Sequence, residues 1–384
     1  MPYDVVDREE SAALAAGHPH SLLHVDRAEI DLPPETDPYS DAVYAKAREN
    51  FLALQKNGAL IRETEPCLYL YQQRMGQHVQ VGVATVCHIE DYEHDIIKKH
   101  EKTRRDKEDD RTRLIGTLSA DTGPVFLTYR DSPAIDALVI DVQKEAPLYD
   151  FQAPDGIQHT VWRVPGADAF VKAFGDVPVS YVADGHHRTA SAVRVGRERR
   201  AANPAHTGQE DYNWFLAVLF PGSQLQILPY NRAVKDLHGH SKEAFLAAVE
   251  KAFTLGPNGS PSPQRPGEIR MYLDGAWYNL TWQPAADADP ISQLDVTGLQ
   301  DRLLAPLLGI DDPRTSKRID FIGGIRGTDE LVRLVDSGKA AVAFSMYPTT
   351  VEQLMAIADA NQIMPPKSTW FEPKLRSGLF VHTF

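Results

Sequence analysis

An uncharged apolar segment that ends at an Asp-Gly pair constrains this chain more than any other sequence feature. Residues 177–183 are mostly β-branched, aromatic or small, which predicts a buried strand. Residues 189–199 place small and apolar side chains on one side and arginines on the other, as an amphipathic helix does. A strand that turns directly into a helix is typical of α/β structure, and Asp184 is then the expected N-cap of the helix.

The start of this predicted helix has the composition of an anion-binding site. Backbone N–H groups in the first turn of a helix lack intrahelical acceptors, and the helix dipole favours negative charge there. Gly185 lets a ligand approach the backbone closely. His186, His187 and Arg188 add side-chain donors within one turn, and an arginine suits bidentate contact with phosphate. The motif predicts a phosphate site, and the alternative is an ordinary capped helix with solvated histidines.

A second candidate group lies inside a run of mixed charges, residues 96–111. Two isoleucines at the start of the run should anchor it to the core, and His100, Glu101 and Thr103 follow them as a compact acid/base and hydroxyl group. Most runs of this kind are solvated surface, which is the alternative here. We treat His100 and Glu101 as candidate catalytic residues.

The third candidate is a proline-rich basic segment, residues 364–379. Prolines hold its backbone stiff, so its cationic and hydroxyl groups can converge on an anion at little entropic cost. Its aromatic residues favour packing onto the body of the protein, whereas the alternative is an exposed basic tail. The candidate anion-binding residues are Lys367, Ser368, Thr369 and Lys374.

Composition and charge restrict the class of partner. The 384 residues are 42% hydrophobic, which supports a full core in two lobes or in one elaborated domain. With 40 Lys and Arg against 53 Asp and Glu, the net charge of −13 opposes a nucleic-acid partner. No apolar run could span a bilayer and the start does not resemble a signal peptide, so we expect a cytoplasmic protein with no membrane partner. A homodimer is left open.

Helical and strand patterns alternate along the chain, which predicts a mixed α/β (α+β) fold. Residues 67–89 alternate as two strands around a Met-Gly turn and predict a hairpin, while residues 21–25 are expected to form a short apolar strand. Residues 256–266 are rich in Pro, Gly and Ser and are the best linker candidate. We therefore divide the chain into a core region, residues 1–255, and a C-terminal α/β region, residues 256–384, that packs back on the site.

Several motifs stand in a recognisable order along the chain. They are residues 100–103, 184–188, 294–297 with 303–309, 319–324 and 364–378. Together they resemble the domain-of-unknown-function family 1015 over nearly the whole chain. This family is largely uncharacterised, so the resemblance implies membership and says little about chemistry.

The strand, the Asp-Gly-His-His-Arg unit and the helix also resemble the same unit in free-serine kinases with a ParB/sulfiredoxin-like fold. This resemblance implies a nucleotide-binding core of that fold with added hairpins. It implies nucleotide phosphates and Mg²⁺ at the helix start, and an upstream glutamate that acts on the serine hydroxyl. Carried over to this chain, the glutamate is Glu101 and Asp184 is the metal ligand. The phosphate region is formed by Gly185, His186, His187, Arg188 and Thr189.

These observations lead to one main hypothesis and two alternatives. The main hypothesis is a phosphotransferase, a small-molecule kinase that moves a phosphoryl group from ATP or ADP, with Mg²⁺, to free L-serine or a similar hydroxylated metabolite. Glu101, or else His100, would accept the hydroxyl proton, and Asp184 would cap the helix or bind Mg²⁺. The first alternative is a nucleotide-binding regulatory protein without phosphotransfer. The second is a nuclease-like or DNA-partitioning protein, which rests on fold analogy and is opposed by the net charge.

Overall fold

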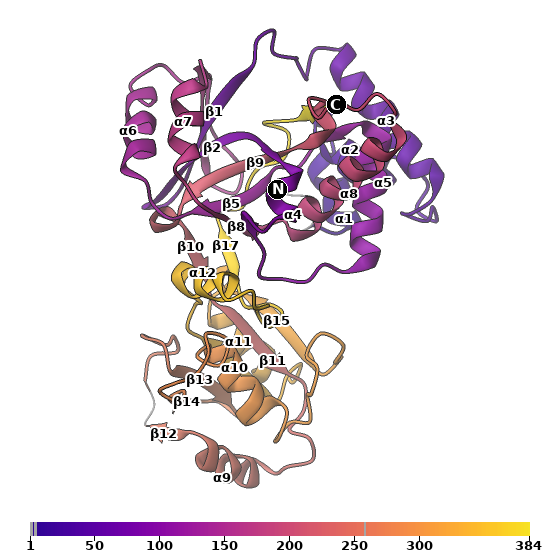
Figure 1. The fold of residues 1–384 in the computed structure, drawn as a ribbon. Helices are drawn as coiled ribbons and strands as arrows, with labels where there is room; N and C mark the ends of the chain where they lie inside the picture. Colours follow the sequence, from indigo (N-terminus) through magenta and orange to yellow (C-terminus); the bar gives the residue numbers. More distant parts are fainter. Residues whose placement is uncertain (1–2, 4–5, 257–258) are drawn as a thin grey trace. The chain divides into compact units, whose positions relative to one another are not determined.

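The computed structural model describes residues 3, 6–256 and 259–384, and the chain forms two compact units. The first unit comprises Met1–Leu225 and Pro373–Phe384, and the second comprises Gln226–Glu372 (Figure 1). The boundaries between the units lie at 225/226 and 372/373, whereas the predicted boundary lies at 255/256. Residue 256 ends one strand of a sheet of the second unit and residue 268 begins another strand of the same sheet, so the predicted linker lies within that unit. Residues 257 and 258 lie outside the described residues.

The first unit is built on a mixed eight-stranded sheet. Strands β3 and β8 pair in parallel, as do β5 and β9, and the other neighbours are antiparallel. The hairpin predicted for residues 67–89 is confirmed as β1 and β2. The order across the sheet is β3 (Ile97–Lys98), β8 (Ser180–Asp184), β5 (Val125–Tyr129), β9 (Trp214–Pro221), β2 (His78–His88), β1 (Cys67–Met75), β7 (Gln158–Pro165) and β6 (Tyr149–Gln152).

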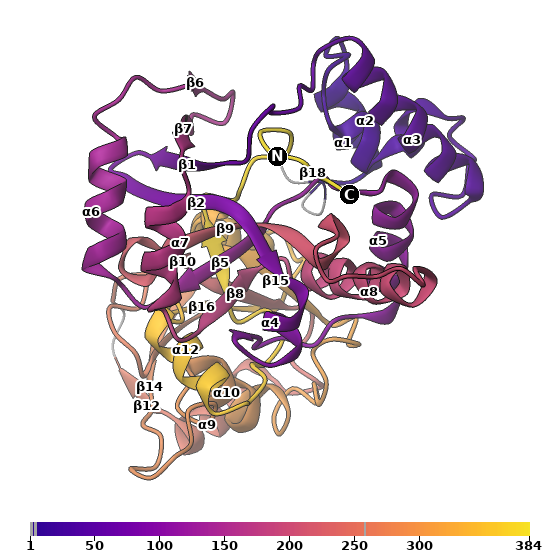
Figure 2. The same ribbon diagram turned by 45° about the horizontal axis from the view of Figure 1, so that its top comes forward.

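Helices pack around this sheet in two groups. Figures 1 and 2 show α6 (Pro133–Val142) and α7 (Asp168–Gly175) side by side at one side of the sheet, and α5 (Arg105–Leu118) and α8 (His186–Ala202) together at the other. The remaining elements of the unit are α1 (Arg8–Ala15), α2 (Leu23–Asp26), η2 (Ala28–Asp31), α3 (Asp41–Lys56), α4 (Ile89–Glu93), β4 (Ala120–Asp121), η3 (Asp211–Asn213), η4 (Gly222–Gln224) and β18 (His382–Thr383).

The short strand predicted for residues 21–25 is wrong, because the chain forms helix α2 there. Leu23, Val25 and Asp26 are buried in this helix, which packs against α3. An apolar run of this length has no period that separates a strand from a helix. Packing against α3 therefore decides the outcome.

Helix α8 packs closely against its neighbours at Gly196. A Cβ atom there would lie 2.6 Å from the backbone oxygen of Tyr212 and 2.7 Å from Cδ1 of Ile89. Because a backbone carbonyl cannot rotate away, we expect Gly196→Ala to destabilise the protein by about 1–3 kcal/mol. Gly116 in α5 is the matched control, since a Cβ there meets no atom within 4 Å. Gly116→Ala should stabilise by about 0.5–1 kcal/mol. Urea unfolding of both variants measures the difference, and shifts of the same sign would contradict the close packing.

The second unit contains a six-stranded antiparallel sheet and a separate two-stranded one. The larger sheet has the order β12 (Thr254–Gly256), β14 (Ala276–Thr281), β13 (Glu268–Leu273), β16 (Val342–Met346), β11 (Tyr230–Val234) and β15 (Ile319–Gly323). The smaller one pairs β10 (Gln226–Leu228) with β17 (Trp370–Glu372). The helical segments are α9 (Lys242–Ala252), α10 (Asp295–Leu299), the π-helical η5 (Gln300–Leu304), η6 (Gly324–Arg326), α11 (Asp329–Asp336) and α12 (Val351–Asp359). The predicted mixed α/β class is thus confirmed.

None of the described helices in either unit is both long enough and apolar enough to cross a bilayer.

Candidate functional site

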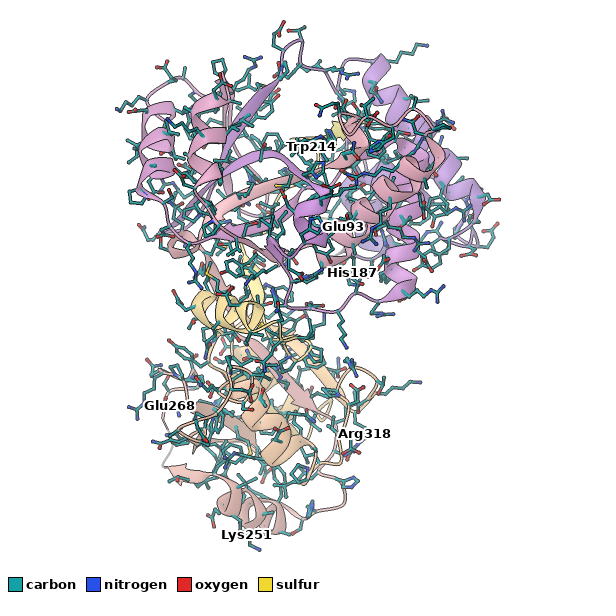
Figure 3. The ribbon with its side chains drawn as sticks, viewed as in Figure 1. Glu93, His187, Trp214, Lys251, Glu268 and Arg318 are labelled. Atoms are coloured by element: carbon teal, nitrogen blue, oxygen red, sulfur yellow. The ribbon has the colours of Figure 1, made fainter. Side chains whose placement is uncertain are left out.

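Parallel pairing of β3 with β8 brings two of the predicted groups together. Ile97 lies opposite Ser180 and Lys98 opposite Tyr181, so both strands end at the same edge of the sheet. The segment that begins at His100 therefore follows β3 at the place where β8 leads into α8. His187 at the start of α8 (Figure 3) confirms the contact, because its Nε2 accepts a hydrogen bond from the backbone N–H of Arg104 at 3.0 Å.

Two buried histidines, one from each segment, lie face to edge at this junction. The side chains of His100 and His186 are only 1% and 6% exposed, and their Nε2 atoms are 3.3 Å apart. Each Nδ1 is buried without a hydrogen-bond partner among the described residues. Burial lowers the pKa of His186 to about 4, and burial together with the neighbouring His186 lowers the pKa of His100 well below its ordinary value. Both rings are therefore neutral near pH 7.

This histidine pair should make the protein sensitive to acid. The pKa of His186 is about 4 in the folded state and near 6.5 when unfolded, so the unfolded state binds more protons between these values. The contribution of neutral His186 to the free energy of unfolding is fully present above pH 6.5 and is lost as the pH falls towards 4. For His186→Gln, which does not titrate there, we expect the loss of unfolding free energy between pH 7 and pH 5 to be about 2 kcal/mol smaller. Urea unfolding at both pH values tests this, with the exposed His18→Gln as control, and an unchanged pH dependence would contradict it.

Asp184 ends β8 between two cations. Its Oδ2 lies 3.4 Å from Nζ of Lys374 and 3.5 Å from a guanidinium nitrogen of Arg188. Burial alone would raise the pKa of Asp184, but Lys374 and then Arg188 outweigh it and hold that pKa well below its usual range. Asp184 is therefore ionised. It is not the N-cap that we predicted, because that position is taken by Gly185 and no side chain caps the helix.

Gly185 is required at this turn for two reasons. Its φ angle is +98°, which favours glycine, and an added Cβ would come within 3.1 Å of the guanidinium of Arg188. Arg188 is only 8% exposed and also donates to the backbone oxygen of Pro124, so it braces the turn from inside. Thr189 is fully buried and donates to the backbone oxygen of Gly185 at 3.0 Å. In this structure its hydroxyl therefore bonds to the backbone of the first turn of α8.

Of the four predicted anion-binding residues in the C-terminal segment, Lys374 belongs to the first unit. Its side chain reaches Asp184. The Nε2 of Gln73 donates to the backbone oxygen of Lys374 at 2.8 Å, and the Nε2 of Gln80 donates to Oε1 of Gln73 at 3.0 Å. Both glutamines are buried. Sequence reasoning missed them, although polar residues at inward positions of otherwise apolar strands were the available signal.

Lys367, Ser368 and Thr369 belong instead to the second unit. The backbone oxygen of Lys367 accepts from Arg232 at 3.1 Å, and the hydroxyl of Ser368 donates to Pro365 at 2.6 Å. Their predicted role therefore stays a prediction, and the first unit offers only Lys374 from this segment.

The two remaining residues of the candidate group in the charged run, Glu101 and Thr103, differ in exposure. Glu101 is exposed, whereas Thr103 is half-buried and donates to Oε2 of Glu108 at 2.9 Å. Of His100, Glu101 and Thr103, Glu101 is thus the residue placed to meet a ligand from solvent. Among the described residues, no group of three or more His, Cys, Asp or Glu side chains is arranged to hold a metal ion.

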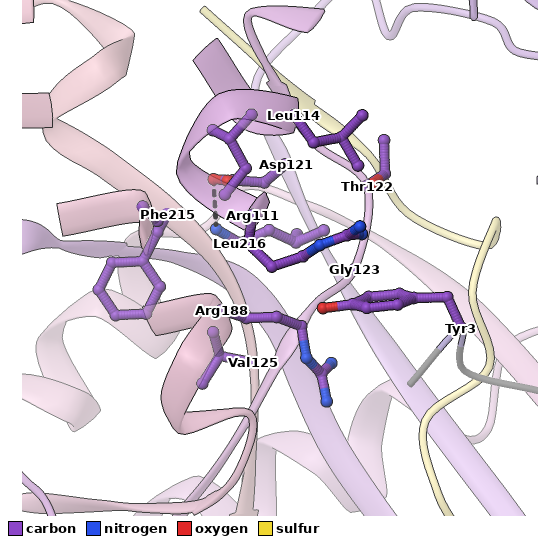
Figure 4. A pocket seen from close by; sticks show the side chains of 12 residues that line it. Tyr3, Arg111, Leu114, Asp121, Thr122, Gly123, Val125, Arg188, Phe215 and Leu216 are labelled. Atoms are coloured by element: carbon purple, nitrogen blue, oxygen red, sulfur yellow. Dashed lines mark hydrogen bonds between the residues drawn. The ribbon is translucent and has the colours of Figure 1, made fainter. Parts of the chain in front are cut away.

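On the other side of Arg188 lies a small pocket (Figure 4). Its polar lining includes Tyr3, Arg111, Asp121 and Thr122, and most of the rest is apolar. Arg188 therefore forms a wall between this pocket and the carboxylate of Asp184.

With this geometry the chain can be compared with known proteins. It belongs to a family of proteins whose function is unknown. That family is DUF1015, described as "Protein of unknown function", and its model matches residues 1–297. The resemblance noted from the ordered motifs is confirmed over residues 1–297. No curated protein matches the sequence.

Several solved structures resemble the fold distantly. A free serine kinase in complex with AMP has a TM-score of 0.38 at 11% sequence identity, covering 75% of this chain and 86% of that chain. SbnI from Staphylococcus aureus, truncated at its C-terminus, has a TM-score of 0.40 at 11% identity, covering 77% and 85%. A conserved hypothetical protein from Pyrococcus furiosus has a TM-score of 0.37 at 11% identity, covering 77% and 93%. Likeness at this level does not assign an activity.

Proposed function

We propose that this protein is a small-molecule kinase that transfers a phosphoryl group from ATP or ADP to free L-serine or a similar hydroxylated metabolite. The observation that carries the proposal is the junction of β3 and β8. There Asp184, Lys374 and Arg188 form a compact charged cluster at the start of α8, and the segment with Glu101 follows the neighbouring strand. Phosphoryl transfer needs fixed charges and positioned groups more than it needs covalent chemistry from the protein, and this junction offers both.

The nucleotide phosphates would bind at the first turn of α8. Backbone N–H groups and the helix dipole favour an anion there, and no side chain caps the helix start. Of the two cations beside Asp184, Lys374 is better placed to contact a bound phosphate, because its side chain is 16% exposed and its ion pair with Asp184 is long at 3.4 Å. Arg188 is more deeply buried, so its part is to hold Asp184 and the turn in place.

The donor set at this junction fits Mg²⁺ only as a partner of the nucleotide. Asp184 supplies the one carboxylate at the end of β8, and Mg²⁺ commonly binds through one or two carboxylates together with substrate phosphates. Asp184 would hold the ion. When bound, the ion would neutralise charge on the transferred group.

Glu101 would act as the general base. The acceptor hydroxyl oxygen forms the new bond to phosphorus, the bond from phosphorus to the leaving oxygen of the nucleotide breaks, and the hydroxyl proton passes to the carboxylate of Glu101. His100 was the competing candidate. Its burial and its contact with His186 favour a structural part, in which the pair fixes the segment that carries Glu101.

The experiment that tests the proposal is a screen for nucleotide turnover. The purified protein is incubated with Mg²⁺ and either ATP or ADP, together with L-serine, L-threonine, L-homoserine or a non-amino alcohol such as glycerol. Formation of a phosphorylated acceptor is followed by ³¹P NMR. Acceptor-dependent turnover is expected. Nucleotide binding without turnover for any acceptor would instead favour the regulatory alternative, and absence of nucleotide binding would remove both.

A further inference from the structure

The pocket beside Arg188 combines charges of both signs with apolar walls. Leu114, Ile115, Val125 and Phe215 form much of its lining. Figure 4 shows the hydroxyl of Tyr3 directed into the space between Arg111 and Arg188. Apolar pockets with a few convergent polar groups are typical of small-molecule sites, where the polar groups fix the orientation of the ligand.

Asp121 is the carboxylate of this pocket, and the described residues offer it only long polar contacts. It is 5% exposed. Its Oδ2 accepts a hydrogen bond from the backbone N–H of Leu216 at the long distance of 3.4 Å, and Nδ1 of His382 lies 3.8 Å away. A buried carboxylate normally receives several strong hydrogen bonds or pairs closely with a cation. A ligand with an ammonium group would supply what Asp121 lacks.

Two guanidinium groups provide the opposite charge. Arg111 stacks on the ring of Tyr3, with its Cζ 4.3 Å from the ring centroid, and is held by Asp110 at 2.7 Å. Arg188 comes from the start of α8 and also contacts Asp184. Both arginines line the pocket, so a carboxylate bound there would face two cations and the hydroxyl of Tyr3.

From this arrangement we infer that the pocket binds a small α-amino acid, with its ammonium group toward Asp121 and its carboxylate toward Arg111 and Arg188. The inference goes beyond the proposed function, because Arg188 separates the pocket from Asp184 and neither Asp184 nor Glu101 lines it. The binding itself needs no nucleotide. A neutral sugar or alcohol would leave Asp121 without a cation. A simple carboxylic acid would satisfy the arginines alone.

Calorimetric titration with L-serine and its two truncated analogues tests the pairing. Ethanolamine lacks the carboxylate and 3-hydroxypropionate lacks the ammonium group. We expect L-serine to bind at least about tenfold more tightly than either analogue, since each loses one charged contact. Glycine, L-alanine, L-threonine and L-homoserine are titrated as well, with and without ADP. If no amino acid binds under either condition, or if L-serine binds no better than its analogues, the inference is wrong.

Asp121→Asn locates the ammonium group. Asparagine keeps the size of the side chain and an oxygen for the N–H of Leu216, but it loses the charge. The affinity for L-serine should fall by about 10–100-fold, while that for 3-hydroxypropionate changes less than about threefold. The control is Asp141→Asn, an exposed residue of α6 with the same change of charge, which should alter neither affinity. Equal losses for both ligands in Asp121→Asn, with unchanged thermal unfolding, would overturn the assignment.

The two proposals fail separately in this design. Amino-acid binding without phosphoryl transfer would leave the pocket assigned and remove the kinase. Transfer to acceptors that lack an amino group, without amino-acid binding, would keep the kinase and remove the pocket.

Discussion

Glu101→Gln is expected to lower the rate of phosphoryl transfer by about 10²–10⁴-fold, the usual contribution of a general base. Glutamine keeps the size and hydrogen bonding of the side chain but cannot accept the proton. The affinity for ADP should stay within about threefold, because the loss falls on the chemical step and not on binding. Single-turnover kinetics separate the two quantities, with ADP affinity measured by calorimetry on the same preparation.

The matched controls use the difference in burial between the candidate bases. Glu35→Gln removes an exposed carboxylate elsewhere in the first unit and should leave turnover unchanged. His100→Asn removes a ring that is 1% exposed and lies against His186. It should therefore lower the free energy of unfolding by more than it raises the activation free energy of phosphoryl transfer at saturating substrate. If Glu101→Gln keeps wild-type turnover while a folded His100→Asn loses it, the two roles are exchanged.

Lys374→Met should weaken the binding of ADP by about 10–100-fold, the equivalent of one charge-assisted hydrogen bond. Methionine fills a similar volume without the charge, and the backbone oxygen of Lys374 still accepts from Gln73. Loss of the ammonium group also leaves Asp184 with Arg188 as its only cation among the contacts described here, so anionic phosphates would meet more negative charge. Calorimetry with ADP measures the effect.

Lys144→Met is the control for Lys374→Met. Lys144 is exposed and pairs with Asp141 at 2.6 Å, so the net charge changes equally without affecting the site. Lys374→Arg should retain part of the affinity, since it keeps the charge but changes the reach and geometry. Unchanged ADP affinity in Lys374→Met would remove Lys374 from the nucleotide site.

Local patterns predicted the parts of this site but not their arrangement. The strand before Asp184, the helix after it and the hairpin of β1 and β2 each follow from hydrophobic periodicity within one segment. The contact between His100 and His186 joins residues that are 86 positions apart, and the contact between Lys374 and Asp184 spans 190 positions. Strand order sets the first of these, and no local period encodes strand order.

Because local patterns do not encode long-range contacts, they predict a single feature for the basic segment near the C-terminus. Its prolines, lysines and hydroxyl residues are similar on both sides of residue 372, yet Lys367 and Lys374 belong to different units. The side-chain amides of Gln73 and Gln80 hold the chain at Lys374, and these lie on strands far away in sequence. Only the pairing of β1 with β2 places them together.

The division of the first unit into two stretches of chain has a consequence for biosynthesis. Residues 226–372 are translated as a unit of their own after the strands and α8 of the first unit, and Lys374 follows them. In a nascent chain that has not yet released residue 374 from the ribosome, Asp184 lacks its lysine partner, so this ion pair forms only after residues 226–372 have been synthesised. The lysine charge beside Asp184 is therefore added last.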